Sequence, residues 1–227
     1  MILALDTSTR TIGLAVYNGF EVLSETIWGS QDYHTMQLAP AVDDLLLHAN
    51  LKLDDLKAIA IATGPGSFTG LRIGMALAKG LALARHLPLI GIPSLDVLAA
   101  AQPVQEVPLA AVLRAGRGRL AVGWYHAKAN AWQSVGQLEV LTVPELFDKI
   151  EEPTMVCGEL AHADRQALAR KRKIILLASP AQSLRRPSFL AELAWKRLRK
   201  GLVDDPVSLA PIYLHYKNPI QEWACRC

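Results

Sequence analysis

Cysteine is scarce in this sequence, and its spacing excludes a disulfide-bonded scaffold. Three cysteines are present among 227 residues: Cys157, Cys225 and Cys227. An odd count without regular spacing is not the pattern of a small secreted domain and favours a reducing compartment. Cys225 and Cys227 have no His or Cys pair near them to complete a tetrahedral metal site. We therefore interpret the C-terminal Cys-Arg-Cys as a loose tail rather than as a metal or redox site.

The sequence also lacks the patterns of export and membrane segments. No basic residue precedes the first apolar run, and Asp6 interrupts that run, which excludes a plain signal peptide. No uninterrupted apolar run reaches the ~18 residues that a membrane span needs. The Ala- and Leu-rich stretch after Gly70 contains Arg72, Lys79 and Arg85, so it predicts a buried helix of a soluble protein. We expect a cytoplasmic protein without membrane contact.

A strong excess of one charge is likewise absent. The formal net charge is +3, and 51% of the residues are hydrophobic, which is enough to bury a core. A dedicated nucleic-acid binder concentrates positive charge more strongly. The clearest basic segments are residues 165–173 and 185–200. Charges at helical spacing in the second segment favour a solvated helix face over an RNA-contacting surface.

Apolar runs and turn signals predict the same order of strands and helices twice. The first group has strands at residues 2–5, 12–17, 21–28, 58–62 and 89–92, with helices at 34–50 and 67–86. After a Pro- and Ala-rich stretch at 101–108, the second group has strands at 109–113, 120–126, 132–141, 155–157 and 174–177, with helices at 144–150, 164–170 and 187–201. We predict a structural duplication in which each half is a mixed sheet with helices against it.

The first motif is a polar turn, Asp6-Thr7-Ser8-Thr9, between two predicted strands. Such a turn directs backbone N–H groups and small hydroxyls into one concavity, which suits a phosphate or a carboxylate that holds a hydrated cation. Asp6 could supply that carboxylate. The alternative is a hairpin loop in which Asp6 and Thr9 satisfy their own backbone.

The second motif, at residues 63–74, combines glycines with a predicted helix start. Gly64 and Gly66 allow backbone angles that other residues avoid, and Ser67 is the expected N-cap of the helix that follows. The N-terminus of that helix offers unpaired N–H groups to an anion in the cleft. This motif and the first would therefore border one cleft.

Small residues every four positions on this helix favour close approach of another helix. They leave two interpretations, packing within the chain and dimerisation, of which we prefer dimerisation. A bulky residue at Gly74 is then expected to abolish pairing and leave the chain folded. The expected interface residues are Leu38, Val42, Leu45, Gly70, Leu71, Gly74, Met75 and Ala78.

The first hundred residues resemble the TsaB family. The resemblance is carried by the segments at 1–9, 64–74, 78–82 and 92–96, and residues 210–214 resemble the family's ending. It implies an α/β fold of the actin-like ATPase and sugar-kinase-like (ASKHA) type, built from two ribonuclease-H-like subdomains. The expected boundaries are residues 1–103 and 104–214, followed by a tail at 215–227.

The resemblance also implies a role in tRNA modification. It implies a non-catalytic partner of the paralogue TsaD, acting with the ATPase TsaE in threonylcarbamoyl transfer to an adenosine next to the anticodon of tRNAs that read ANN codons. The chain would meet tRNA through that complex and could also form a homodimer. No cofactor, metal or catalytic residue is expected, and Asp6 to Thr9 would be a degenerate nucleotide-binding turn.

Departures from the catalytic pattern support this non-catalytic assignment. A TsaD-like chain has a His-x-x-x-His pair where this sequence has Ser94 and Leu98, and neither side chain replaces an imidazole ligand. The expected second phosphate loop falls at residues 113–120, which hold three arginines and no acid. That segment is either an anion-binding loop or a solvated turn, and the latter is preferred. The glycine-rich adenosine loop is missing.

Three other functions remain to be weighed. An active ATPase or phosphotransferase of the same fold would need Asp6 and a second acid in the cleft. A metalloprotease would need a His-Glu-x-x-His or similar site, which the sequence lacks. Direct binding of tRNA by this chain alone would give a steep dependence on salt.

Overall fold

The computed structural model describes residues 1–30, 34–170 and 173–214. The predicted tail at 215–227, with Cys225 and Cys227, lies outside the described residues. Cys157 is buried in a strand, and burial raises the pKa of its thiol to about 12. Within the described part of the chain, no helix is long and apolar enough to cross a membrane.

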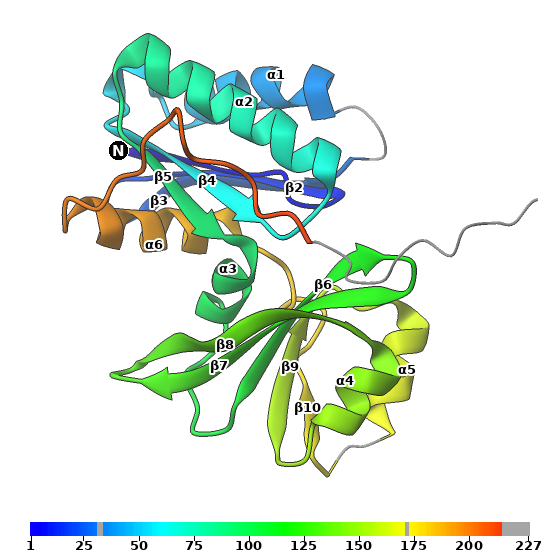
Figure 1. The fold of residues 1–227 in the computed structure, drawn as a ribbon. Helices are drawn as coiled ribbons and strands as arrows, with labels where there is room; N and C mark the ends of the chain where they lie inside the picture. Colours follow the sequence, from blue (N-terminus) through cyan, green and yellow to red (C-terminus); the bar gives the residue numbers. More distant parts are fainter. Residues whose placement is uncertain (31–33, 171–172, 215–227) are drawn as a thin grey trace, which may run out of the picture.

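The first lobe is a five-stranded mixed sheet covered by helices on both faces (Figure 1). Its strands, in the order β3-β2-β1-β4-β5, are β1 (Ile2–Asp6), β2 (Thr11–Tyr17), β3 (Val22–Gly29), β4 (Ala58–Gly64) and β5 (Leu89–Pro93). The helices α1 (His34–His48) and α2 (Phe68–Arg85) cover one face, and α6 (Pro187–Leu198) covers the other. A short 3-10 turn, η1 (Leu53–Asp55), precedes β4.

The second lobe repeats this topology. Its sheet, in the order β10-β9-β6-β7-β8, contains β6 (Leu109–Gly116), β7 (Arg119–Lys128), β8 (Ala131–Thr142), β9 (Thr154–Gly158) and β10 (Ile175–Leu177). The helices are α3 (Ser94–Ala100), α4 (Val143–Lys149) and α5 (His162–Ala169). In both lobes the first strand pairs antiparallel with the second and parallel with the fourth. The predicted duplication is confirmed.

The buried strands explain why the sequence gives this sheet. All residues of β1 and of β4 are buried, because helices cover both faces of these central strands, and their sequences are continuous apolar runs. The outer strand β3 is instead only half-buried and carries polar residues at its centre. The predicted Asn18-Gly19 turn joins β2 to β3, where the Asn18 side chain accepts from the N–H groups of Phe20 and Glu21.

The two lobes exchange helices, which corrects the predicted boundary. The helix α6, which follows the second sheet, packs its Leu190 and Ala194 against Ile2 of the first sheet. Conversely, α3 follows the first sheet and packs Leu98 against Leu109 of the second. The prediction that residues 104–214 form one subdomain is therefore wrong, because α6 contributes to the core of the first lobe. The helix α3 was not predicted.

The predicted interface residues lie in the interior, so they do not form an exposed surface. All eight are buried: Leu38, Val42, Leu45, Gly70, Leu71, Gly74, Met75 and Ala78. The small-residue stripe of α2 faces the turn after β1, where the Thr7 hydroxyl donates to the Gly70 carbonyl at 2.8 Å. A Cβ on Gly74 would overlap the Thr7 hydroxyl. The alternative of packing within the chain is correct, and a bulky residue at Gly74 would disturb the fold.

The opposite side of the two helices is exposed, and we call it the outer helix face. Its apolar and small residues are Met36 and Leu47 of α1 with Phe68, Ala76, Gly80 and Leu83 of α2. Met36 and Leu47 are more than 70% exposed. Both helices lie on the outside of the first lobe, away from the second sheet (Figure 1).

Candidate functional site

A large cleft lies where the lobes meet, with a volume of about 1120 Å³. Its lining comes from the turn after β1, from the start of α2, from the end of β6 and from the residues after β9. The carboxyl ends of several strands therefore open into one cavity, which is where open α/β sheets place ligand sites. Of the four predicted turn residues, Thr9 lines this cavity, and the other three lie beneath it.

The hydroxyls of the predicted turn are used within the protein. The Thr7 hydroxyl donates to the Gly70 carbonyl, and the Ser8 hydroxyl shares a hydrogen bond of 2.6 Å with Ser94. The Ser94 hydroxyl in turn accepts from the Gly64 N–H. The four residues form one turn, as predicted. Thr7 and Ser8, however, hold this turn against the second motif and do not line the cavity.

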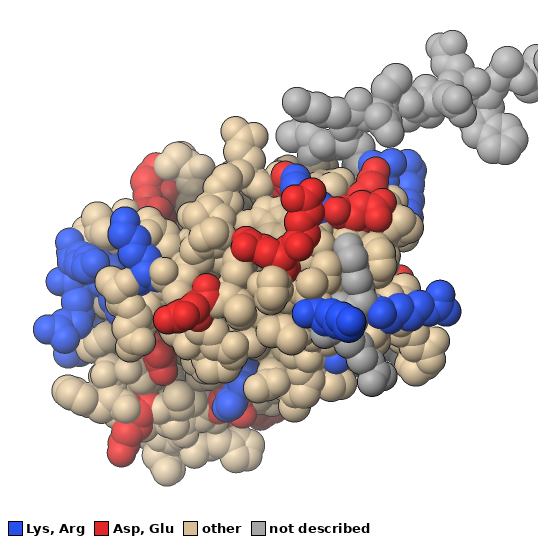
Figure 2. All heavy atoms as spheres, turned by 90° about the horizontal axis from the view of Figure 1, so that it is seen from below, with Lys and Arg blue, Asp and Glu red and all other residues tan. Residues whose placement is uncertain are grey.

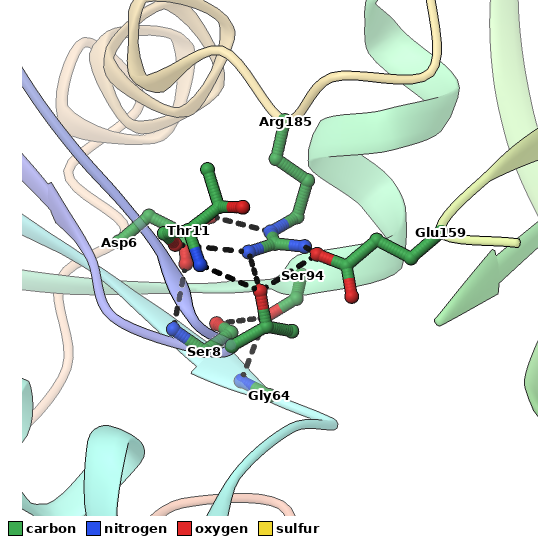
Figure 3. A network of polar contacts seen from close by, with 8 residues as sticks. Asp6, Ser8, Thr11, Gly64, Ser94, Glu159 and Arg185 are labelled. Carbon is green, nitrogen blue, oxygen red and sulfur yellow. Dashed lines mark hydrogen bonds and ion pairs between the residues drawn. The ribbon is translucent and has the colours of Figure 1, made fainter. Parts of the chain in front are cut away.

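The carboxylate of Asp6 forms an ion pair with the guanidinium of Arg185 (Figure 3). The Arg185 Nε donates to Asp6 Oδ2 at 2.9 Å, while Asp6 Oδ1 accepts from the Ser8 N–H. The guanidinium also donates to the Thr9 hydroxyl at 2.7 Å and to Glu159 Oε1 at 2.5 Å. Both side chains of the Asp6–Arg185 pair are almost fully buried.

The Arg185 network joins the two lobes. Asp6 and Thr9 belong to the first lobe, whereas Glu159 follows β9 of the second, and Thr9 also donates to Glu159 Oε1 at 2.6 Å. Burial alone would lower the pKa of the Arg185 guanidinium, but the carboxylates of Asp6 and Glu159 raise it above its ordinary value. Arg185 therefore stays protonated as the counter-charge that Asp6 and Glu159 share.

The second motif has the predicted geometry. Ser67 is the N-cap of α2, and its hydroxyl accepts from the Gly70 N–H at 3.3 Å. The Ser67 N–H donates to the Ser8 carbonyl at 2.6 Å, which joins the two motifs. Gly64 has a φ of +104°, which favours glycine, and a Cβ on Gly66 would overlap the Ser8 backbone.

The residues at the base of the cleft do not fit the metal-bound nucleotide that enzymes of this fold use. Both oxygens of Asp6 already accept hydrogen bonds, and Arg185 supplies its counter-charge. Ser94 and Leu98, where the resemblance would place the histidine pair of a TsaD-like chain, are buried in the polar network and in a hydrophobic core. No group of three or more His, Cys, Asp or Glu side chains could hold a metal ion within the described ranges.

Sequence reasoning missed Arg185 and Glu159. Arg185 lies in the basic segment that was interpreted as a solvated helix face, yet its exposed fraction is 3%, whereas the side chain of its neighbour Arg186 is half exposed. No local pattern separates the two arginines, because burial of Arg185 depends on a carboxylate 179 positions away. Of the arginine-rich loop, Arg114 lines the cleft, as the anion-binding alternative requires.

A second buried polar contact lies within the second lobe, between α3 and β7. The Tyr125 hydroxyl of β7 donates to Asp96 Oδ1 of α3 at 2.7 Å. Burial raises the pKa of the Asp96 carboxyl above its ordinary value, although the bond from Tyr125 acts in the opposite direction. Removing the charged Asp96 carboxylate from water therefore lowers the stability of the folded protein.

Charge on the outer surface is mixed. Figure 2, which looks at the molecule from below, shows Lys and Arg toward the two sides of this face, with Asp and Glu among and between them. A surface that binds nucleic acid by charge alone would carry a continuous basic stripe. This face is not such a surface.

Comparisons with known proteins agree with the fold. Residues 21–214 match the family model described as TsaD, tRNA N6-adenosine threonylcarbamoyltransferase. The chain is 30% identical over 229 aligned positions to the tRNA threonylcarbamoyladenosine biosynthesis protein TsaB of Bacillus subtilis. That alignment covers 98% of this chain and 97% of the relative.

Solved structures give the same result. YeaZ from Pseudomonas aeruginosa superposes with a TM-score of 0.77 at 26% identity, over 94% of this chain and 99% of that one. A ROK hexokinase from Thermus thermophilus, at 12% identity, superposes with a TM-score of 0.50 over 88% and 99% of the two chains, which shows the sugar-kinase-like fold alone. The chain therefore belongs to the TsaD and TsaB family of threonylcarbamoyladenosine proteins, on its TsaB branch.

Proposed function

We propose that this chain is a non-catalytic partner of a TsaD homologue in the synthesis of threonylcarbamoyladenosine on tRNA. The observation that carries the proposal is the Asp6–Arg185 pair. An enzyme of this fold needs a free carboxylate at this position to hold a metal ion. Here the Arg185 guanidinium already occupies the carboxylates of Asp6 and Glu159. Such a pair favours a structural role over an ATPase or phosphotransferase, the alternative derived from the sequence.

The outer helix face is the surface that we propose for docking TsaD. Its exposed apolar residues lie on both helices, and Ala76 and Gly80 offer no side chain that would keep a partner helix at a distance. A Cβ on Gly80 would meet nothing within 4 Å. A paralogue of the same fold has an equivalent helix pair, so two such faces can pack together and bury the ~800 Å² per partner of a stable interface. The same face could form a homodimer when TsaD is missing.

The test compares two identical substitutions on exposed helix positions. Ala76→Arg lies on the outer helix face, and Ala163→Arg lies on α5 of the second lobe. We expect Ala76→Arg to abolish co-purification with a co-expressed TsaD homologue and Ala163→Arg to leave it unchanged. Circular dichroism should show both variants folded, because neither side chain is buried.

Activity completes the test. Threonylcarbamoyl transfer to tRNA, measured with the TsaD and TsaE homologues, should require this chain and should be lost with Ala76→Arg. Unchanged pairing and transfer with Ala76→Arg would reject this docking surface. Magnesium-dependent ATP turnover by the isolated chain would reject the non-catalytic role and favour the ATPase.

A further inference from the structure

The cleft between the lobes carries positive charge that the Arg185 network does not use. Arg10 after β1, Arg114 at the end of β6 and Arg165 of α5 line the cavity. Arg10 and Arg114 are exposed, and Arg165 donates one hydrogen bond to the Ala178 carbonyl. The lining contains one carboxylate, Glu159, and that carboxylate is already paired with Arg185. The cavity is therefore lined by an excess of cations.

The arginines that line the cavity come from both lobes. Arg10 belongs to the first lobe, whereas Arg114 and Arg165 belong to the second. Their guanidinium groups are planar donors whose geometry matches the oxygens of a phosphate. A ligand with phosphate groups could therefore contact both lobes at once, which a flat surface patch would not allow.

A buried hydroxyl provides an independent sign of a missing partner. Ser183 also lines the cavity, its exposed fraction is 8%, and its Oγ has no hydrogen-bond partner in the described part of the chain. A buried polar group without a partner costs stability unless a water or a ligand satisfies it. Ser183 therefore gives the cleft a polar group that a ligand oxygen could satisfy.

Bound phosphates usually need a metal ion in enzymes of this fold, but here the residues do not fit one. Arg185 is built into the base of the cleft and neutralises Asp6 from within the protein. An anion in the cavity would be held by arginines alone, and magnesium would have no carboxylate free to hold it there.

We propose that the cleft binds a small phosphate-bearing anion of about the size of pyrophosphate, directly through Arg10, Arg114 and Arg165 and without a divalent metal. The ligand is small because the three arginines line one open cleft between the lobes rather than a long basic surface. The proposal does not depend on docking to TsaD, because the cleft and the outer helix face share only Phe68.

Isothermal titration calorimetry of the full chain with pyrophosphate tests the proposal at constant ionic strength. We expect one binding site whose affinity is the same with magnesium and with EDTA. Arg10→Gln and Arg114→Gln should each weaken binding about tenfold or more, since each removes a charge-assisted hydrogen bond. The matched control is Arg117→Gln, which removes the same charge from the same hairpin outside the cavity and should leave the affinity unchanged.

A second arm with ADP identifies the source of the phosphates. Equal affinity for ADP and pyrophosphate would indicate a free anion, and tighter binding of ADP would indicate a nucleoside phosphate; the same arginine variants must weaken both. Absence of binding, a requirement for magnesium, or equal loss with Arg117→Gln would overturn the proposal. Displacement of pyrophosphate by a short RNA that binds more tightly would also overturn it in favour of a nucleic-acid surface.

Discussion

Arg185 and Arg186 are neighbours with the same side chain and different surroundings. Arg185 is buried between two carboxylates, whereas Arg186 pairs with Glu25 at the surface. Loss of one partner from a buried ion pair leaves a charge without compensation, whereas loss of an exposed pair has little effect on stability. Burial therefore decides how much an arginine ion pair contributes to the stability of the folded protein.

The first prediction compares these two arginines. Arg185→Met should lower the free energy of unfolding by about 3–5 kcal/mol, because Asp6 and Glu159 then face each other without a cation. Arg186→Met should lower it by at most about 1 kcal/mol. Urea denaturation measures both values. Equal losses in the two variants would contradict a structural role for the buried pair.

The second prediction concerns the pH dependence of Asp96. Its ordinary pKa is 3.8, and burial raises it in the folded state. Between the two values the folded protein holds a proton that the unfolded chain releases, so the free energy of unfolding falls as pH rises through this window. Asp96→Asn keeps an acceptor for Tyr125 and removes the titration. It should therefore be more stable than the parent protein at pH 7.

The measurement is urea denaturation from pH 3 to pH 8, with the exposed Asp43→Asn as control for the same chemical change. In this series Asp96→Asn should show a smaller fall of stability with rising pH than the control does. A variant less stable than the parent protein at pH 7 would show that the Asp96 carboxylate stabilises the contact with Tyr125.

At the scale of the element, α2 has two glycines with opposite surroundings. Gly74 faces the turn after β1, where an added Cβ would overlap the Thr7 hydroxyl. Gly80 lies on the outer helix face, where an added Cβ would meet nothing within 4 Å. Backbone entropy disfavours both glycines in a helix, so packing alone separates their substitution effects.

The third prediction follows from this difference. Gly80→Ala should raise the free energy of unfolding by about 0.5–1 kcal/mol, because alanine is the better helix former. Gly74→Ala should lower it by about 1–3 kcal/mol, because the core has no room for a methyl group. Thermal and urea denaturation test both. If both variants gained stability, the close contact between α2 and the turn after β1 would be wrong.

Signals from neighbouring residues predicted most helices and strands. Which face of a helix is buried depends on contacts distant in sequence, and this could not be predicted. The Ser67 N-cap and the ends of α2 follow from neighbouring residues, and the structure confirms them within a residue. The face of α2 that is buried depends on the turn after β1, so the sequence analysis assigned Gly74 and Ala78 to a surface. The short α3 was missed because seven residues give too few helical turns to show a period.

At the scale of the molecule, the chain ends its described course as a strap over the first lobe. Residues 204–214 begin at Asp204, whose N–H donates to the Leu89 carbonyl of the edge strand β5. Farther along, Leu209 packs on the hydrophobic core, and the Ile212 N–H donates to the Thr63 carbonyl at 2.7 Å. The strap runs over β4 and β5 beside α2 (Figure 1), so it covers a sheet edge that could otherwise pair with another chain.

The fourth prediction tests the strap by truncation. A chain that ends at Val203 should lose on the order of 3 kcal/mol of stability, from the bond of Asp204 to β5, the packing of Leu209 and the bond of Ile212. A chain that ends at Leu214 keeps all three contacts and serves as control. Hydrogen exchange at β5 should accelerate only in the shorter chain. Equal protection of β5 in both chains would show that the strap does not secure the edge.

The fold class was predictable because each half is a local series of strands and helices with a recognisable period. The exchange of α3 and α6 between lobes was not, since their apolar residues alone do not indicate which sheet they cover, and α3 even contributes to both cores. The cleft was predicted from Asp6 to Thr9, but its charge was not. That charge depends on Arg10, Arg114 and Arg165 from three separate segments.

The Asp6–Arg185 pair has a consequence for how the chain could change over time. Placing a metal at Asp6 would require removal of Arg185, and that first step alone leaves Asp6 and Glu159 without their shared counter-charge in a less stable protein. A second change, at Glu159 or beyond, would have to follow before any selective benefit appeared. The pair would therefore make the non-catalytic state that we propose difficult to leave, because no single substitution restores a site for a metal.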